Sequence, residues 1–271
     1  MPTIDTVAAL LTKAQRTDNE AEADAYLSKA QQLATLHAID LATAAAKAAN
    51  KGKRAVPVQR QISVGEPRKR VNKPLISLFS AIASSNDVMI DIAHNSTYVI
   101  AYGLPDDIET VENIWLACAP RMVEDATRWV RGGAWRGDYV QYWDRDWHRY
   151  MEKPATAHAA KAAFFSAFTY RIKTRLAEGR KEAIVQADAE QPTLGETGTA
   201  GGAELVLVAK ADQVGKFYKQ TSNARGSWRG YQGASLGSRS TSGQAGDRAG
   251  RAAQLGGEKK VGWRAGAISS S

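Results

Sequence analysis

The chain has little of the chemistry that would cross-link it, anchor it or export it. Its 271 residues contain one cysteine, Cys118, so no intramolecular disulfide can form. No apolar run approaches the roughly 20 residues that span a bilayer. The first residues, MPTIDTVAALL, lack the positive segment and long apolar run of a signal peptide. We therefore expect a soluble, cytoplasmic protein that does not contact a membrane.

The sequence also lacks the common motifs of cofactor-dependent catalysis. The glycine-rich stretch at 243–257 has no Gly-Lys-Ser/Thr end, so it is not a phosphate-binding P-loop. There is no HExxH motif, no paired Cys/His motif and no Rossmann fingerprint. We therefore expect no cofactor, and a binding function is favoured over an enzymatic one.

What the chain does have is positive charge concentrated in two segments. The net charge is +8. Residues 51–73 contain eight Lys and Arg against Glu66 alone, giving +7, and residues 209–271 contain eleven against three acids, giving +8. The rest of the chain therefore carries −7. Such segregation favours contact with nucleic acid or another polyanion; the alternative is that flexible basic segments only keep the protein in solution.

Two short amphipathic helices are predicted over residues 3–37. Apolar positions recur at spacings of three and four on both sides of a turn at 16–19, so the helices should pack as an antiparallel hairpin. His37 ends the second helix, where an imidazole can interact with the last carbonyls. A short Ala-rich helix over 41–49 follows.

The order of residues in this hairpin resembles a known family. The motif residues are Leu10, Leu11 and Ala14 before the turn, Glu20, Ala21, Glu22 and Ala23 after it, then Lys29, Ala30, Gln31, Leu33, His37 and Ile39. The pattern is similar to the N-terminal module of an uncharacterised bacterial and phage family, the domain of unknown function 2786. The resemblance implies an accompanying larger domain, but no reaction and no catalytic residues.

A helix and a β-hairpin are predicted next. Residues 74–84 have one apolar helical face. Residues 88–92 and 97–102 are rich in β-branched and aromatic residues, and 94–96 supply the turn between them.

A long helix at 106–130 should follow, with Pro120 kinking or splitting it. We expect a flexible loop at 132–137. Residues 55–64 are an expected edge strand, because Pro57 argues against a central place in a sheet.

The longest predicted helix covers residues 154–180, with an apolar face and a basic face. Pro154 suits its first turn. The preceding stretch YVQYWDRDWHRYM, at 139–151, is interpreted as a charged loop whose aromatic rings pack on the body. Beyond the long helix we expect a connector at 190–202, a buried strand at 203–208, a short helix at 210–219 and a mobile Gly/Ser/Arg-rich tail.

Candidate nucleic-acid-binding residues are cations of the linker, the long helix and the tail, with one aromatic residue. Cationic side chains bind phosphates and aromatic rings stack on bases. The predicted set is Lys53, Arg54, Arg68, Lys69, Arg70, Arg171, Arg175, Arg225, Trp228, Arg229, Arg248 and Arg251. The tail has a second interpretation, in which Gly243, Gly246 and Gly250 let a short helix pack closely on the body, and a third, in which it is disordered without a role.

Other reactive residue types have simpler explanations. Carboxylates and imidazoles gather at Asp144, Asp146, His148 and His158, but their spacing matches no metal motif, so we favour a solvated charged loop. Cys118 lies among apolar helical residues and should be a buried thiol. Asp106 and Asp107 suit the positive end of a helix better than a pair of catalytic acids.

We therefore predict an α+β protein with a helical hairpin at 1–50, a basic linker at 51–73, a central domain at 74–220 and a tail at 221–271. In the central domain, a small antiparallel sheet is covered by long helices. The favoured function is a non-enzymatic nucleic-acid-binding accessory protein that uses the linker and tail. The alternatives are a protein-interaction or assembly component, of the kind that phages encode, and a metal-dependent enzyme built on Asp144, Asp146 and His148.

Overall fold

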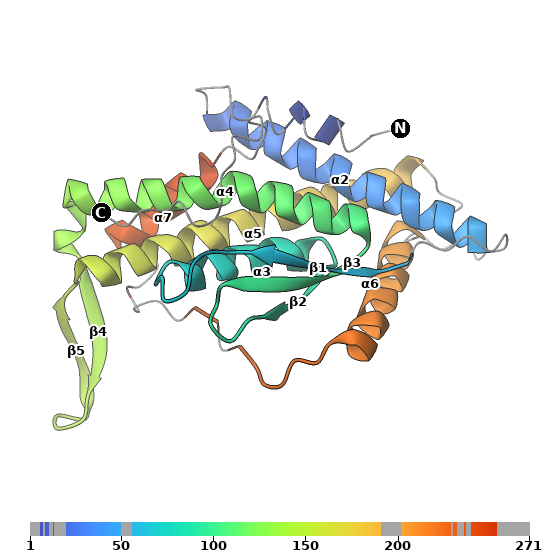
Figure 1. The fold of residues 1–271 in the computed structure, drawn as a ribbon. Coiled ribbons are helices and arrows are strands. Elements are labelled where there is room, and N and C mark those ends of the chain that lie inside the picture. Colours follow the sequence, from blue (N-terminus) through green and yellow to red (C-terminus); the bar gives the residue numbers. More distant parts are fainter. Residues whose placement is uncertain are drawn as a thin grey trace.

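The computed structural model describes residues 6–7, 9–10, 13, 20–49, 56–190, 202–228, 230–231, 236 and 240–253. Its elements are α2 (Glu20–Ala49), β1 (Val58–Ser63), α3 (Asn72–Ser85), β2 (Met89–Ile92), β3 (Tyr98–Gly103), α4 (Pro105–Gly132), the 3-10 helix η1 (Ala134–Gly137), β4 (Tyr139–Asp144), β5 (Arg149–Pro154), α5 (Ala157–Glu190), α6 (Gly202–Thr221) and α7 (Thr241–Arg251). Long helices with two small antiparallel sheets confirm the α+β class (Figure 1).

Helix α5 is the centre of the molecule. Helices α2, α3, α4 and α7 all pack along it (Figure 1). Phe164, Phe168, Ile172 and Leu176 recur every four residues and are buried, so one stripe of α5 supplies much of the core. The helix begins after Thr156, whose hydroxyl accepts a hydrogen bond from Ala159 N at 3.2 Å.

The larger sheet has the strand order β1-β3-β2, and both pairs are antiparallel. The predicted hairpin at 88–102 is confirmed, and β1 lies at an edge as Pro57 indicated. One face of the sheet contributes Ile62, Val99 and Ala101 to the core. On the other face Tyr102 packs edge-to-face against Tyr218 of α6, with ring centroids 5.1 Å apart.

The predicted helices at 74–84 and 106–130 are confirmed as α3 and α4. Pro120 lies inside α4, which continues through it to Gly132, so the predicted split does not occur. The expected flexible loop at 132–137 is wrong: Gly133 ends α4 with φ of 75° and η1 follows directly. A residue in the left-handed region is the common way to end a helix, and glycine adopts it without steric cost.

The N-terminal prediction needs one correction. Helix α2 does not end at His37 but continues to Ala49, because the Ala-rich residues there favour a helix and contain no glycine or proline. The His37 imidazole instead lies 3.6 Å from the carboxylate of Asp106 on α4. The first predicted helix falls mostly outside the described residues, although Val7 is helical and buried in the core.

Two predictions in the C-terminal half are also wrong. Residues 203–208 are not a strand but the first turns of α6, whose buried positions Ala203, Leu207, Lys210 and Val214 follow a helical period. Pro154 does not begin the long helix but ends strand β5. The stretch from Tyr139 to Pro154 is a second β-hairpin, which projects from the helical body at one end of the molecule (Figure 1).

Candidate nucleic-acid interface

Arg68, Lys69 and Arg70, hereafter the cationic turn, lie exposed between β1 and α3. Lys69 Nζ is 3.7 Å from a carboxylate oxygen of Glu66. Within the described residues, neither Arg68 nor Arg70 has an ion-pair partner. The two guanidinium groups therefore remain available to an anion from outside the protein.

The segment that carries the cationic turn is held in a defined shape. The Asn72 side chain is buried, and its Nδ2 donates a hydrogen bond to the Glu66 carbonyl at 2.8 Å. Arg68 has φ of 66°, which is uncommon for a residue other than glycine. The first turn of α3, which follows at once, contains no carboxylate. The Asn72 N–H donates to the Lys69 carbonyl and Pro74 has no N–H, so this helix end adds positive potential beside the arginines through the helix dipole and not through a row of free N–H groups.

Three of the four cations predicted around α7 form contacts within the protein. Arg175 is 4% exposed, and its Nη1 donates hydrogen bonds to the carbonyls of Gly250 at 2.7 Å and Ala253 at 3.3 Å. Arg171 and Arg251 both donate to the carboxylate of Asp247, at 2.6 Å and 3.0 Å. Arg171 and Arg175 therefore stabilise the contact between α5 and α7, whereas Arg251 pairs with Asp247 within α7. The fourth predicted cation there, Arg248, is exposed.

The N-terminus of α7 is held by its cap residue Ser240, whose hydroxyl accepts a hydrogen bond from Gly243 N at 3.0 Å, and by the carboxylate of Asp138. Asp138 is buried and accepts hydrogen bonds from the backbone N–H and the hydroxyl of both Thr241 and Ser242, at 2.6 to 3.0 Å. Burial alone would raise the pKa of Asp138, but the hydrogen bonds from Ser242 and Thr241 outweigh it and hold the pKa below its ordinary value. The carboxylate is therefore ionised at neutral pH and favourably placed at a positive helix end.

Glycines determine how closely α7 approaches α5. A Cβ atom on Gly246 would overlap the carbonyl oxygen of Phe164, and one on Gly250 would lie 2.9 Å from the Arg171 Cβ. This confirms the interpretation in which glycines let a short helix pack closely on the body. The expectation of a mobile tail is therefore wrong for residues 241–251.

The remaining predicted residues do not join the cationic turn in one cluster. Arg225 and Trp228 lie exposed in the extended segment after α6 (Figure 1). Further along this segment Tyr231 is partly buried and packs against the core. The predicted residues outside the described part of the chain are Lys53, Arg54 and Arg229. The structure thus separates the predicted set into the cationic turn, the segment after α6 and the contacts of α7.

The hairpin at 139–154, hereafter the aromatic arm, corrects the expectation of rings packed on the body. Trp143, Trp147 and Tyr150 are 49%, 70% and 72% exposed. The signal was present in the sequence, since aromatic and polar residues partly alternate with a period of two, as in a strand. The charged residues at its tip obscured that signal.

The acidic and histidine residues of the arm form a turn. One carboxylate oxygen of Asp144 accepts hydrogen bonds from the N–H groups of Asp146 and Trp147, at 3.0 Å and 3.1 Å. His148 has φ of 45° in the same turn, and His158 lies exposed on α5. Across the described residues, no group of three or more His, Cys, Asp or Glu side chains is arranged to hold a metal ion.

A buried ionic cluster attaches α6 to the body. Lys210 Nζ is 3.1 Å from Asp87 and 3.2 Å from Asp107, and Arg180 donates two hydrogen bonds to the Asp87 carboxylate. Burial raises the pKa of Asp107, although Lys210 opposes the change. Asp107 lies in the first turn of α4, as predicted, and its charge partner is a residue far away in the sequence. The cluster joins α4, α5 and α6 to the turn between α3 and β2, and these contacts explain it as a structural feature.

A second polar cluster lies where the end of α6 meets the sheet. The carboxylate of Asp91 accepts hydrogen bonds from Tyr102, Tyr218 and Ser222, at 2.7 to 2.8 Å. Burial and the contact with Asp91 raise the pKa of Tyr102 to about 12. A hydroxyl with so high a pKa stays protonated and acts as a donor to Asp91. Cys118 is fully buried, and burial raises the pKa of its thiol, so it is an inert core residue as predicted.

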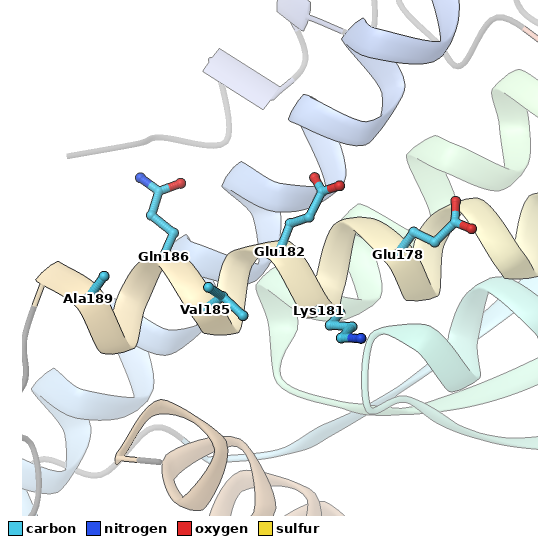
Figure 2. Close-up of a pocket in the computed structure, with 6 residues that line it drawn as sticks. All are labelled: Glu178, Lys181, Glu182, Val185, Gln186 and Ala189. Carbon is cyan, nitrogen blue, oxygen red and sulfur yellow. The ribbon is translucent and has the colours of Figure 1, made fainter. Parts of the chain in front are cut away.

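A shallow groove of 480 Å³ runs along the exposed side of α5 (Figure 2). It is lined by Glu178, Lys181, Glu182, Val185, Gln186 and Ala189. All six residues belong to one helix, and Figure 2 shows them spread along it. A small-molecule site usually has polar groups that converge from several elements, so this groove does not indicate an enzyme active site.

The N-terminal part of this α+β chain is similar to a known family. Residues 3–41 match the model of a family described as Protein of unknown function (DUF2786). The match confirms the resemblance carried by the hairpin motif and ends within α2. No curated protein and no solved structure matches the chain significantly. Among the helices of the described residues, none is long and apolar enough to cross a membrane.

Proposed function

We propose that this chain is a non-enzymatic nucleic-acid-binding accessory protein that holds phosphates with its cationic turn. The observation that carries the proposal is the exposure of Arg68 and Arg70 without ion-pair partners among the described residues. The turn also directly precedes the positive end of α3. Guanidinium groups bind phosphate oxygens in pairs of parallel hydrogen bonds, so two free arginines beside a helix end suit a phosphodiester backbone.

The use of other arginines supports this choice. Arg60 pairs with Glu112, Arg121 and Arg128 pair with Asp125, and Arg180 pairs with Asp87. Each of these cations has its charge partly neutralised within the protein. The cationic turn retains its charge, and it belongs to the segment 51–73, which carries +7.

Binding of fluorescent oligonucleotides, measured by anisotropy at two salt concentrations, tests the proposal. The test variant carries Arg68→Gln and Arg70→Gln. The control carries Lys216→Gln and Lys219→Gln, two exposed cations on α6, and loses the same charge. Because each phosphate contact releases about one counterion, the test variant should bind more weakly and reduce the slope of log affinity against log salt by about 2.

The control should retain the wild-type slope within error. The proposal is overturned if the wild-type protein binds neither single- nor double-stranded DNA or RNA. It is also overturned if the test and control variants lose affinity equally, because general charge would then explain binding.

A further inference from the structure

Most of the exposed large aromatic residues of the described protein lie in the aromatic arm. Its large exposed rings are Tyr139, Tyr142, Trp143, Trp147 and Tyr150. The cross-strand register pairs Trp143 with Tyr150, whose ring centroids lie 5.1 Å apart at an interplanar angle of 74°. Outside the arm, exposed aromatic residues are isolated, as Tyr170 is on α5. A cluster of this kind indicates an interaction surface.

The cations of the arm lie beside its rings. The Arg149 guanidinium is 5.6 Å from the centroid of the Trp147 ring, and Lys153 Nζ is 5.1 Å from that of Tyr142. Within the described residues, neither cation forms an ion pair. At the base of the arm Arg131 and Arg136 are also exposed. Rings and cations therefore alternate along a projecting ribbon.

The carboxylates of the arm differ in the hydrogen bonds that they accept. Asp144 accepts the two N–H groups of its own turn, and Glu152 accepts a hydrogen bond from Gln141 at 3.1 Å. At the base, Asp138 is directed into α7. Asp146 is exposed at the tip, and over residues 139–154 the carboxylates of Asp144, Asp146 and Glu152 balance Arg145, Arg149 and Lys153. Contact with phosphates therefore depends on the cations that lie beside the rings and on Arg131 and Arg136 at the base, and not on a net positive charge of the arm.

We propose that the aromatic arm binds single-stranded nucleic acid by stacking its rings on unpaired bases while neighbouring cations meet the phosphates. The inference rests on the function proposed above and names its ligand class. Bases present flat faces to aromatic rings only when they are unpaired, and ring–base stacking with cations alongside is the common basis of single-strand binding.

The exposed rings suit a nucleic-acid occupant because cations already lie beside two of them. All five are Tyr or Trp, and Val140, the first aliphatic residue of the arm, packs at its base against the body. The exposed surface of the arm is therefore formed mainly by flat rings and by the charged and polar side chains beside them, from the base to the tip. The connection between β1 and α3, which carries the cationic turn, lies toward the same end of the molecule (Figure 1).

The test uses the full chain with a labelled oligothymidylate of about 15 nucleotides, the matching oligouridylate and a duplex of equal length. The arm variant carries Trp143→Ala, Trp147→Ala and Tyr150→Ala. A conservative variant carries Phe at the same three positions. Tyr170→Ala is the matched control, because Tyr170 is 70% exposed and lies outside the arm.

We expect the arm variant to lose roughly tenfold or more in affinity for single strands, since each stacked base contributes that order of effect. The conservative variant and the control should stay within about threefold of wild type, because both keep the rings of the arm. Duplex binding should change little in all variants. The same pattern with either oligothymidylate or oligouridylate supports the inference.

The outcomes separate this inference from the proposed function. If the arm variant binds single strands as well as wild type, while Arg68→Gln/Arg70→Gln weakens binding, the arm inference is overturned and the function stands. Equal losses on duplex and single strands would also overturn the arm inference. If the wild-type protein is a dimer that the arm variant dissociates, without loss of oligonucleotide binding, the arm is a protein interface instead. An absence of any binding by wild type overturns both.

Discussion

In both helix α7 and the aromatic arm, the observed burial is the opposite of the burial that the amino-acid composition suggests. Helix α7 comes from a Gly/Ser/Arg-rich stretch typical of a mobile tail, yet Ser242, Gly246 and Gly250 are buried against the body. The arm is rich in Trp and Tyr, residues typical of a core, yet its rings are exposed. The difference shows that the space available beside a backbone, and not the polarity of its side chains alone, decides burial.

The two regions also differ in how they are held. Helix α7 has Asp138 at its first turn and Arg175 at its last carbonyls, and it lies directly on α5 between them. The arm is a two-stranded ribbon, which is marginally stable by itself, and its main support is its connection to η1 and α5. We therefore expect changes in α7 to affect stability and changes in the arm to affect binding.

The largest expected effect comes from Gly246→Ala. The added Cβ would overlap the Phe164 carbonyl oxygen, which is backbone and cannot turn aside, so α7 must move away from α5. We expect a loss of about 3 kcal/mol in the free energy of unfolding, at the upper end for overpacking. Urea unfolding at equilibrium measures it. A loss below about 0.5 kcal/mol, the usual scale of a surface substitution, would contradict the close contact.

Gly215→Ala is the matched control, because Gly215 is also helical and has open space around its Cβ position. Alanine favours helix over glycine by up to about 1 kcal/mol. The control should therefore be neutral or slightly stabilising. If both substitutions destabilise the protein equally, the effect does not arise from the packing of α7.

The next effect comes from Asp138→Asn, which removes the charge that holds the first turn of α7. We expect the free energy of unfolding to fall by about 1 to 2 kcal/mol, which is typical when a helix cap is lost and its hydrogen-bond donors are left poorly paired. Asp144→Asn makes the same change in the turn of the arm and should cost less, since that turn is exposed. Urea midpoints of the two variants give the comparison directly.

The pH dependence of stability tests the same carboxylate. Since the pKa of Asp138 is lowered in the folded protein, its contribution is present above the ordinary carboxyl pKa of about 3.9 and is lost as pH falls through the folded value. Asp247 behaves in the same way: burial would raise its pKa, but Arg171 and Arg251 lower it. The wild type should therefore lose stability below about pH 4, and Asp138→Asn should lose less of it over that range.

The smallest effect on stability is expected in the arm. Cross-strand aromatic pairs contribute roughly 0.2 to 1 kcal/mol, and the rings of Trp143 and Tyr150 are already in water. Trp143→Ala/Tyr150→Ala should shift the global unfolding midpoint by less than any change at Gly246. A large loss of stability in this variant would mean that the arm contributes to the core after all.

Much of the fold followed from periodicity. Helices α3 and α4 and the β2–β3 hairpin were predictable because local pattern and tertiary contact agree in them. The strand predicted at 203–208 is wrong because an apolar run of six residues does not distinguish a strand from the start of a helix such as α6. Its buried positions, from Ala203 to Val214, show the helical period only when the following residues are included.

The candidate site was predictable only in part. The exposure of Arg68–Arg70 followed from a polar run between prolines, because no apolar face there could pack. The structural roles of Arg171 and Arg175 could not be predicted, since their partners in α7 lie about 75 residues away in the sequence. The exposure of the arm could not be predicted either, because the rings of a short hairpin are buried only if another element covers them.

We expect the cationic turn and the aromatic arm, and not α7, to contact nucleic acid. Photochemical cross-linking of the full-length protein to a 5-iodouracil-substituted single strand, with peptide mapping by mass spectrometry, tests it most directly. We expect cross-links within 139–154, with protection of Arg68 and Arg70 from an arginine-modifying reagent in the same complex. Cross-links confined to 241–251, with the arm unmodified and the cationic turn unprotected, would contradict it.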